Sequence, residues 1–266
     1  MCLSAVKLYV GWQTGAQALW ADGLNNATDI IASIAVLIGL RISQKPPDLN
    51  HRYGHFRAET VAALVASLIM FAVGVQVISQ AVRLWISGNF VTPDLTAAWV
   101  SGVCAGVMFL VFRYNLRLAN RIHNQALRAA AMDNRSDALV STGACIGILG
   151  AGLGITWLDP LAAVIVGGII CLTAWNIFRE ATHALTDGFD IEHLDLFKQT
   201  VHSTPGVHSV KDIRARAHGN FILVDITIGV DHELNVTESH AISDEIERRL
   251  YEQHRLDHVH IHVEPT

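Results

Sequence analysis

Long apolar runs alternate with short polar segments from the N-terminus to about residue 181. Five of these runs contain few or no charged residues: 30–40, 61–82, 95–112, 138–158 and 161–178. A helix that crosses a bilayer needs about 20 mainly apolar residues, a length that the first run reaches only when residues 21–29 are added. A weaker run at 3–20 includes Lys7, Gln13 and Gln17. The pattern predicts a membrane bundle of six transmembrane helices, near residues 3–20, 22–43, 57–86, 94–117, 122–155 and 158–181.

Beyond about residue 183 the chain is polar, with shorter periodic segments that end in turn residues. Helices are predicted at 191–202 and 236–254, and strands at 207–217, 221–230 and 259–263. Alternating apolar residues in the second strand favour a strand with one buried face. The order α-β-β-α-β predicts a small two-layer α+β domain. We therefore expect a transmembrane domain at 1–186 and a C-terminal soluble domain, the tail, at 187–266.

Composition supports the membrane assignment, because 51% of the residues are hydrophobic and only 16% are charged, unlike an ordinary soluble domain. The four cysteines stand apart without CxxC spacing, so neither a disulfide framework nor a thiolate zinc site is indicated. Eleven of the fourteen histidines fall at residue 183 or beyond.

Basic residues cluster in two of the predicted loops. The residues in or beside the loop after the second predicted helix and the loop after the fourth include Arg41, Lys45, Arg52, Arg57, Arg113, Arg117, Arg121 and Arg128. Because loops rich in Lys and Arg remain in the cytoplasm, both termini are predicted to be cytoplasmic. The weaker run at 3–20 lacks the small-residue cleavage pattern of a signal peptide.

Two polar pairs interrupt the predicted transmembrane helices, Asn25 with Asp29 and Asp133 with Asp137. Each pair is spaced i, i+4 and so lies on one helical face. An ionisable residue near the bilayer midplane costs about 3 kcal/mol or more and usually marks an ion or proton path. Four oxygen-bearing side chains on two helices predict a site for one small hard cation. The alternative is a buried hydrogen-bond network without a metal.

Three other residues near these pairs need an explanation. Asp22 shares the stripe of Asn25 and Asp29, and we interpret it as a vestibule charge or helix cap near the outer membrane face, with a fifth ligand as the alternative. Asn26 is expected to pack or to form hydrogen bonds. Arg135 lies about 160° around the helix from Asp133, so it requires a charged partner on a neighbouring helix or a wet cavity.

Two groups outside the predicted helices of the membrane domain have metal-ligand chemistry. Asp48, His51 and His55 occupy a short polar loop and could close around a metal with oxygen and nitrogen ligands; a helix cap with two solvated histidines is the alternative. In the tail, residues 260, 262 and 264 share one strand face because the side-chain period is two. His240 on the preceding helix could face them, and a solvated histidine surface is the alternative.

Three stretches together resemble the cation diffusion facilitator family over essentially the whole chain. They are ADGLNNATD at 21–29, PDLNHRYGHFRAE at 47–59 and DNRSD at 133–137. The resemblance implies a homodimer of six-helix subunits with a cytoplasmic ferredoxin-like tail that exchanges divalent metal for protons. The segment before the first predicted helix is shorter than is usual in the family.

The resemblance also implies roles for particular residues. Asp48, His51 and His55 match an accessory metal site. A further group of tail residues matches positions that bind metal between the tails of a dimer: His240, His262 and Glu264. Lys211 stands where zinc-type members can have histidine, and Arg57 and Asp187 match positions that can form a charged interlock, with ordinary surface charges as the alternative.

The helical pairs also predict the metal. Zinc-transporting relatives place histidine in one or both pairs, whereas this chain has Asn25, Asp29, Asp133 and Asp137, as in the manganese-type subgroup. An all-oxygen site suits Mn²⁺, although chemistry alone also permits Mg²⁺, Ca²⁺ or Fe²⁺. Three carboxylates against one dication leave surplus negative charge, so one aspartate is expected to carry a proton when the metal leaves.

The predicted function is export of Mn²⁺ from the cytoplasm in exchange for protons, across the cytoplasmic membrane of a bacterium. The expected partners are metal ions, protons, membrane lipid and a second copy of the chain, without nucleic acid. A Zn²⁺ or Fe²⁺ exporter and a metal channel or receptor without exchange are the alternatives. An intramembrane aspartyl protease is disfavoured, because residues 130–133 and 136–137 lack a GxGD-type element, and we expect no enzyme activity.

Overall fold

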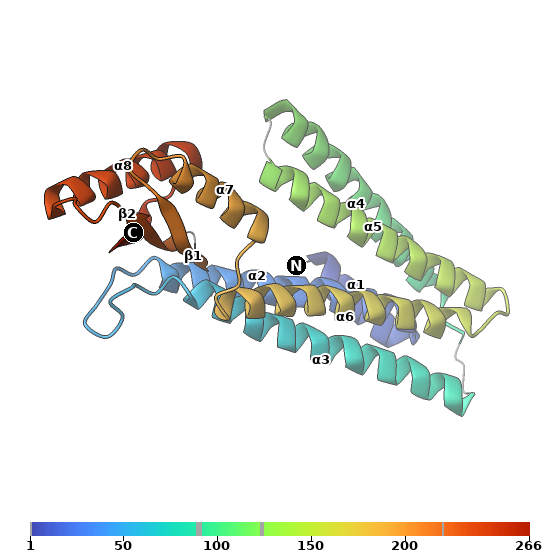
Figure 1. The fold of residues 1–266 in the computed structure, drawn as a ribbon. Helices are drawn as coiled ribbons and strands as arrows, with labels where there is room; N and C mark the ends of the chain where they lie inside the picture. Colours follow the sequence, from blue (N-terminus) through green and yellow to red (C-terminus); the bar gives the residue numbers. More distant parts are fainter. Residues whose placement is uncertain (1, 89–91, 123–124, 220) are drawn as a thin grey trace. The chain divides into compact units, whose positions relative to one another are not determined.

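The computed structural model describes residues 2–88, 92–122, 125–219 and 221–266. Six helices come first along the chain (Figure 1). They are α1 (Cys2–Thr14), α2 (Gln17–Ser43), α3 (Ala58–Ser87), α4 (Leu95–Ile122), α5 (Gln125–Gly152) and α6 (Leu158–Leu185). Each corresponds to one of the predicted transmembrane segments.

The predicted helix at 3–20 is wrong in its extent, because α1 ends at Thr14 and α2 already begins at Gln17. Gly15 between them has φ 70°, a left-handed conformation that glycine adopts without steric cost and that ends a helix. The part of α1 that the structure describes has 13 residues.

Four helices in the described ranges are long and apolar enough to cross a membrane: α2, α3, α4 and α6. The α5 helix has sufficient length, with 28 residues, but it contains Asp133, Arg135 and Asp137. Length and apolarity therefore identify four membrane-spanning candidates among the described helices, accompanied by α1 and the more polar α5.

The chain forms two compact units, Met1–Ala35 with Val65–Ile177 and Val36–Leu64 with Phe178–Thr266. Small residues let the helices of the first unit approach closely. One core cluster joins α2, α4 and α5 through alanines, with Leu19 and Ile148 as its larger members. The α4 and α5 helices lie side by side in this unit (Figure 1).

The second unit includes the tail, whose elements are α7 (Ile191–His202), β1 (Ser209–His218), β2 (Phe221–Val230), α8 (Val236–His254) and β3 (His258–Pro265). This order confirms the predicted α-β-β-α-β pattern. The sheet order is β1-β2-β3, with β1 and β2 antiparallel and β2 and β3 parallel. Buried residues of β2, α7 and α8 form one core, among them Ile226, Ile228, Val201, Ile246 and Leu250.

Candidate metal centres

The structure brings the two predicted helical pairs into the same unit, on α2 and α5. Asn25 Nδ2 donates a hydrogen bond to Asp137 Oδ1 at 3.4 Å. Asn25 is buried, Asp29 and Asp137 are half-buried and Asp133 is exposed. Asp29 interacts electrostatically with both aspartates of α5. One residue of each pair is therefore in contact across the two helices.

The three carboxylates of this group are not gathered as tightly as metal ligands are. Within the described residues, the one cluster of three or more His, Cys, Asp or Glu ligand atoms within 4.8 Å of one another is Asp48, His51 and His55. Of the four candidate ligands on α2 and α5, the direct contact is that of Asn25 with Asp137. A cation would have to draw the carboxylates together.

Asp22 does not lie in an outer vestibule or cap a helix, so that prediction is wrong. It is fully buried inside α2, and its Oδ1 atom accepts a hydrogen bond from Lys7 Nζ at 2.9 Å. Lys7, on α1, is also fully buried and donates to Asn26 Oδ1 at 2.7 Å, which confirms the hydrogen-bonding role expected for Asn26. The sequence held one signal for this cluster, a lysine inside an otherwise apolar run.

Asp159 at the start of α6 is a second buried acid that the sequence analysis missed. Its two carboxylate oxygens accept the backbone N–H groups of Gln17 at 2.7 Å and Ala18 at 3.0 Å. These groups have no acceptor within their own helix, so Asp159 caps the N-terminus of α2. By contrast, Arg135 is exposed, and no ion pair joins it to another residue of the described chain.

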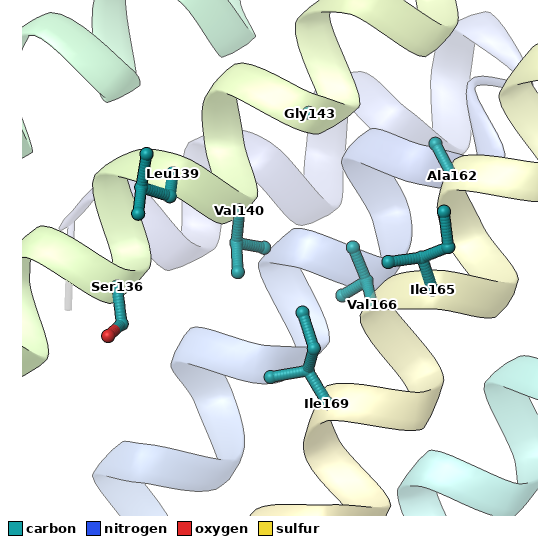
Figure 2. Close-up of a pocket in the computed structure, with 8 residues that line it drawn as sticks. All are labelled: Ser136, Leu139, Val140, Gly143, Ala162, Ile165, Val166 and Ile169. Atoms are coloured by element: carbon teal, nitrogen blue, oxygen red, sulfur yellow. The ribbon is translucent and has the colours of Figure 1, made fainter.

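An apolar crevice lies on another face of α5, against α6 (Figure 2). It has a volume of about 350 Å³, and its lining includes Leu139, Val140, Ile165 and Val166, with the polar Ser136 at one end. Because metal cations require several polar ligands, this crevice is not a cation site.

The predicted loop site between α2 and α3 is assembled in the second unit. His51 Nδ1 lies 3.2 Å from Asp48 Oδ1, and His55 Nε2 lies 3.6 Å from Asp48 Oδ2. The backbone N–H of His51 donates to Asp48 at 2.6 Å, and this hydrogen bond is the main reason that the pKa of the Asp48 carboxyl is below its usual value. An ionised carboxylate beside two imidazoles is a plausible ligand set for a divalent cation.

The residues that follow this loop site contact the tail. Phe56 packs edge-on against Phe221 of β2, with ring centroids 4.8 Å apart. Arg57 forms an ion pair with Asp187, which brings together the two residues of the expected charged interlock. Arg216 of β1 lies 3.9 Å from the other oxygen of the same carboxylate.

The tail brings together two of its three predicted ligands. His262 Nε2 lies 3.6 Å from Glu264 Oε1. Lys211 Nζ donates to the other Glu264 oxygen at 2.6 Å, and this hydrogen bond lowers the pKa of the Glu264 carboxyl. A metal bound by Glu264 would therefore compete with Lys211 for this carboxylate.

The expectation that His240 faces this strand within one chain is wrong. Val259, Ile261 and Val263 of β3 pack on the core shared with the helices. Because side chains alternate along a strand, His262 lies on the opposite face of the sheet from α8. His240 is exposed on α8 beside Asp244, with 3.5 Å between Nε2 and Oδ1.

Comparison with known families and proteins covers the whole chain. Residues 1–186 match the cation efflux transmembrane domain, and residues 174–266 match the cytoplasmic domain of cation efflux proteins. The chain is 53% identical over 265 residues to the manganese efflux system protein MneS of Bacillus subtilis, covering 100% of this chain and 91% of the relative.

More distant matches include a second protein from the same organism. The manganese efflux system protein MneP of Bacillus subtilis is 30% identical over 274 residues, covering 100% of this chain and 92% of the relative. A solved structure named MamM-CTD is 28% identical, covers 29% of this chain and 100% of its own, and has a TM-score of 0.27.

Proposed function

Since the chain belongs to the cation efflux family of metal transporters, we propose that it moves Mn²⁺ out of the cytoplasm in exchange for protons. Metal efflux is the activity of the family, which consists of transporters rather than enzymes. The finer assignment to Mn²⁺ has support from two relatives, MneS and MneP, that are named manganese efflux proteins.

The observation that carries the proposal is the donor set on α2 and α5. Every group of this set that can bind a metal is an oxygen atom, because the amide NH₂ group of asparagine does not coordinate metals. The four residues are Asn25, Asp29, Asp133 and Asp137. Oxygen ligands suit Mn²⁺, whereas imidazole and thiolate favour zinc. The contact between Asn25 and Asp137 supports a site that spans the two helices.

Exchange for protons follows from the charge of this donor set. Three carboxylates and one dication leave one surplus negative charge, and the carboxylates repel one another when the dication leaves. A proton taken up by Asp29, Asp133 or Asp137 would relieve that repulsion. Metal and proton would thus compete for the same oxygen atoms, and competition for one site is the basis of antiport.

The proposed architecture places this site within six transmembrane helices, residues 1–186, in a cytoplasmic membrane. Both termini and the tail, residues 187–266, would lie in the cytoplasm, where two tails pair in a homodimer. The Asp48, His51 and His55 group would hold an accessory metal. His240, His262 and Glu264 would bind metal between the two tails, with ligands from both subunits.

Alanine substitution of the three aspartates tests the proposed transport site. Asp29→Ala, Asp133→Ala and Asp137→Ala should each nearly abolish Mn²⁺ uptake into proteoliposomes, because each removes a charged ligand, and Asn25→Ala should be milder. The variants should still insert into the membrane and form dimers. Size-exclusion chromatography in detergent measures the dimer. Wild-type uptake by any aspartate variant would remove that residue from the site.

A further inference from the structure

Lys7 has a complete set of hydrogen-bond acceptors in a fully buried position. Its ammonium group donates to Asp22 Oδ1 at 2.9 Å, to Asn26 Oδ1 at 2.7 Å and to Ser141 Oγ at 2.9 Å. A lysine ammonium has three N–H donors, so each donor has an acceptor. Burying a charged pair costs several kcal/mol before its attraction is counted, which makes a purely packing role for this cluster an expensive arrangement.

The stem of Lys7 is held where α1 and α2 pack closely. A Cβ atom at Gly11 would lie 2.7 Å from the backbone nitrogen of Trp20, so only glycine permits this approach. Ser4, one turn before Lys7, donates to the backbone oxygen of Gly23 at 3.1 Å. With α1 fixed on α2, the Lys7 ammonium reaches Ser141 and so joins both helices to α5.

This junction lies within about one helical turn of candidate cation ligands on both helices. Ser141 follows Asp137 by four residues on α5 and therefore lies on the same face, about 6 Å further along the axis. On α2, Asn26 is adjacent to Asn25. The hydrogen bond from Asn25 to Asp137, at 3.4 Å, is thus the next connection between the helices that Lys7 already joins.

We propose that Lys7 is a positioning residue for the transport site, which fixes the separation of α2 and α5 so that their ligands reach one cation. The inference rests on the proposed function. Lys7 and Asp22 together are neutral, so the pair sets geometry without changing the net charge that a cation meets. An inert ion pair that only stabilises the bundle is the competing explanation.

A charge-balanced double variant separates these explanations. Lys7→Met with Asp22→Asn removes both charges and leaves no buried ion without a partner, a replacement that buried pairs often tolerate. Residues that orient metal ligands typically contribute 10–100-fold to affinity. We expect the Kd for Mn²⁺, measured by calorimetry on the full chain in detergent, and the KM in proteoliposomes to rise about tenfold or more, while kcat changes much less.

Two buried serines provide a matched pair that leaves the ion pair intact. Ser141→Ala removes an acceptor of Lys7, whereas Ser101→Ala removes a hydroxyl that donates to the backbone oxygen of Ser141 at 2.8 Å. Both serines are fully buried, so the two substitutions cost similar packing. Ser141→Ala should weaken Mn²⁺ binding severalfold, and Ser101→Ala should not.

The outcomes distinguish this inference from the proposed function. If the wild type transports Mn²⁺ and the double variant keeps the wild-type Kd and KM, or if both serine variants lose affinity equally, Lys7 has no positioning role. If the double variant does not fold, the serine pair decides by itself. A wild-type protein that neither binds nor transports Mn²⁺ would overturn both proposals.

Discussion

Ile246→Ala tests whether the tail is a separately folded domain with the core described above. Ile246 is fully buried on α8, in one cluster with Val201, Ile226, Ile228 and Leu250. The substitution removes three carbon atoms, a loss of about 2.4 kcal/mol at about 0.8 kcal/mol per buried methylene. The cavity left behind adds to this figure, and such substitutions cost about 2–5 kcal/mol. We expect a loss of about 3 kcal/mol.

The assay is urea unfolding of the isolated tail, residues 187–266, whose core cluster lies wholly within that segment. In a domain of this size, 3 kcal/mol corresponds to a fall in Tm of about 12–24 °C. Val236→Ala on the same helix is the control, because Val236 is 85% exposed and should change stability by no more than about 0.5 kcal/mol. A loss below about 1 kcal/mol for Ile246→Ala, or equal losses for the two variants, would refute the described core. Below its unfolding temperature, full-length Ile246→Ala should transport Mn²⁺ as the wild type does.

Three further predictions concern metal selectivity and the tail. Asn25→His or Asp133→His should raise Zn²⁺ transport relative to Mn²⁺ in a competition assay, because imidazole favours zinc; unchanged ratios in both variants would place selectivity elsewhere. Lys211→Ala should raise the affinity of the tail for Mn²⁺ in calorimetry, since it frees Glu264. Because the pKa of Glu264 is lowered in the fold, the ion pair with Lys211 stabilises the wild-type tail at neutral pH, and this stabilisation is lost as the pH falls below the ordinary glutamate value of 4.5. Lys211→Ala should abolish this pH-dependent stabilisation. Alanine at His240, His262 and Glu264 together should spare the transport site and shift the half-maximal metal concentration, whereas unchanged transport and no heat of metal binding would leave these residues a solvated surface.

The tail could be predicted from sequence because its signals are local. The predicted bounds of α7, β2 and α8 coincide with those in the structure, since alternation, turn residues and caps occur within each segment. At α8 the Asn235 side chain accepts the backbone N–H of Glu238 while the Glu238 side chain returns to Asn235. Periodicity also predicted which residues share a face of β3. It does not show which face of the sheet α8 covers, because that depends on packing between elements. The position of His240 relative to His262 was therefore not predicted correctly.

The membrane part shows where sequence reasoning fails. Hydrophobicity continues through Gly15 and Ala16, so an apolar average cannot detect the break that a positive φ introduces. The helical stripe correctly placed Asp22 on the face of Asn25, but its partner Lys7 comes from another helix, 15 residues earlier. The hydrophobic periodicity of one helix does not show which residues of another helix contact it. The pairing of Asn25 with Asp137 was accessible only because both lie in i, i+4 pairs with the same chemistry.

Metal flux with simultaneous pH measurement tests the central claim most directly. Purified wild-type protein in proteoliposomes would be given Mn²⁺, Zn²⁺, Fe²⁺ or Mg²⁺ in parallel, with internal metal and internal pH recorded by separate dyes. The account predicts that Mn²⁺ is transported best and that protons move in the opposite direction, both effects being lost in Asp137→Ala. Transport of Mn²⁺ without proton movement, preference for Zn²⁺, or equal flux in the variant would contradict it.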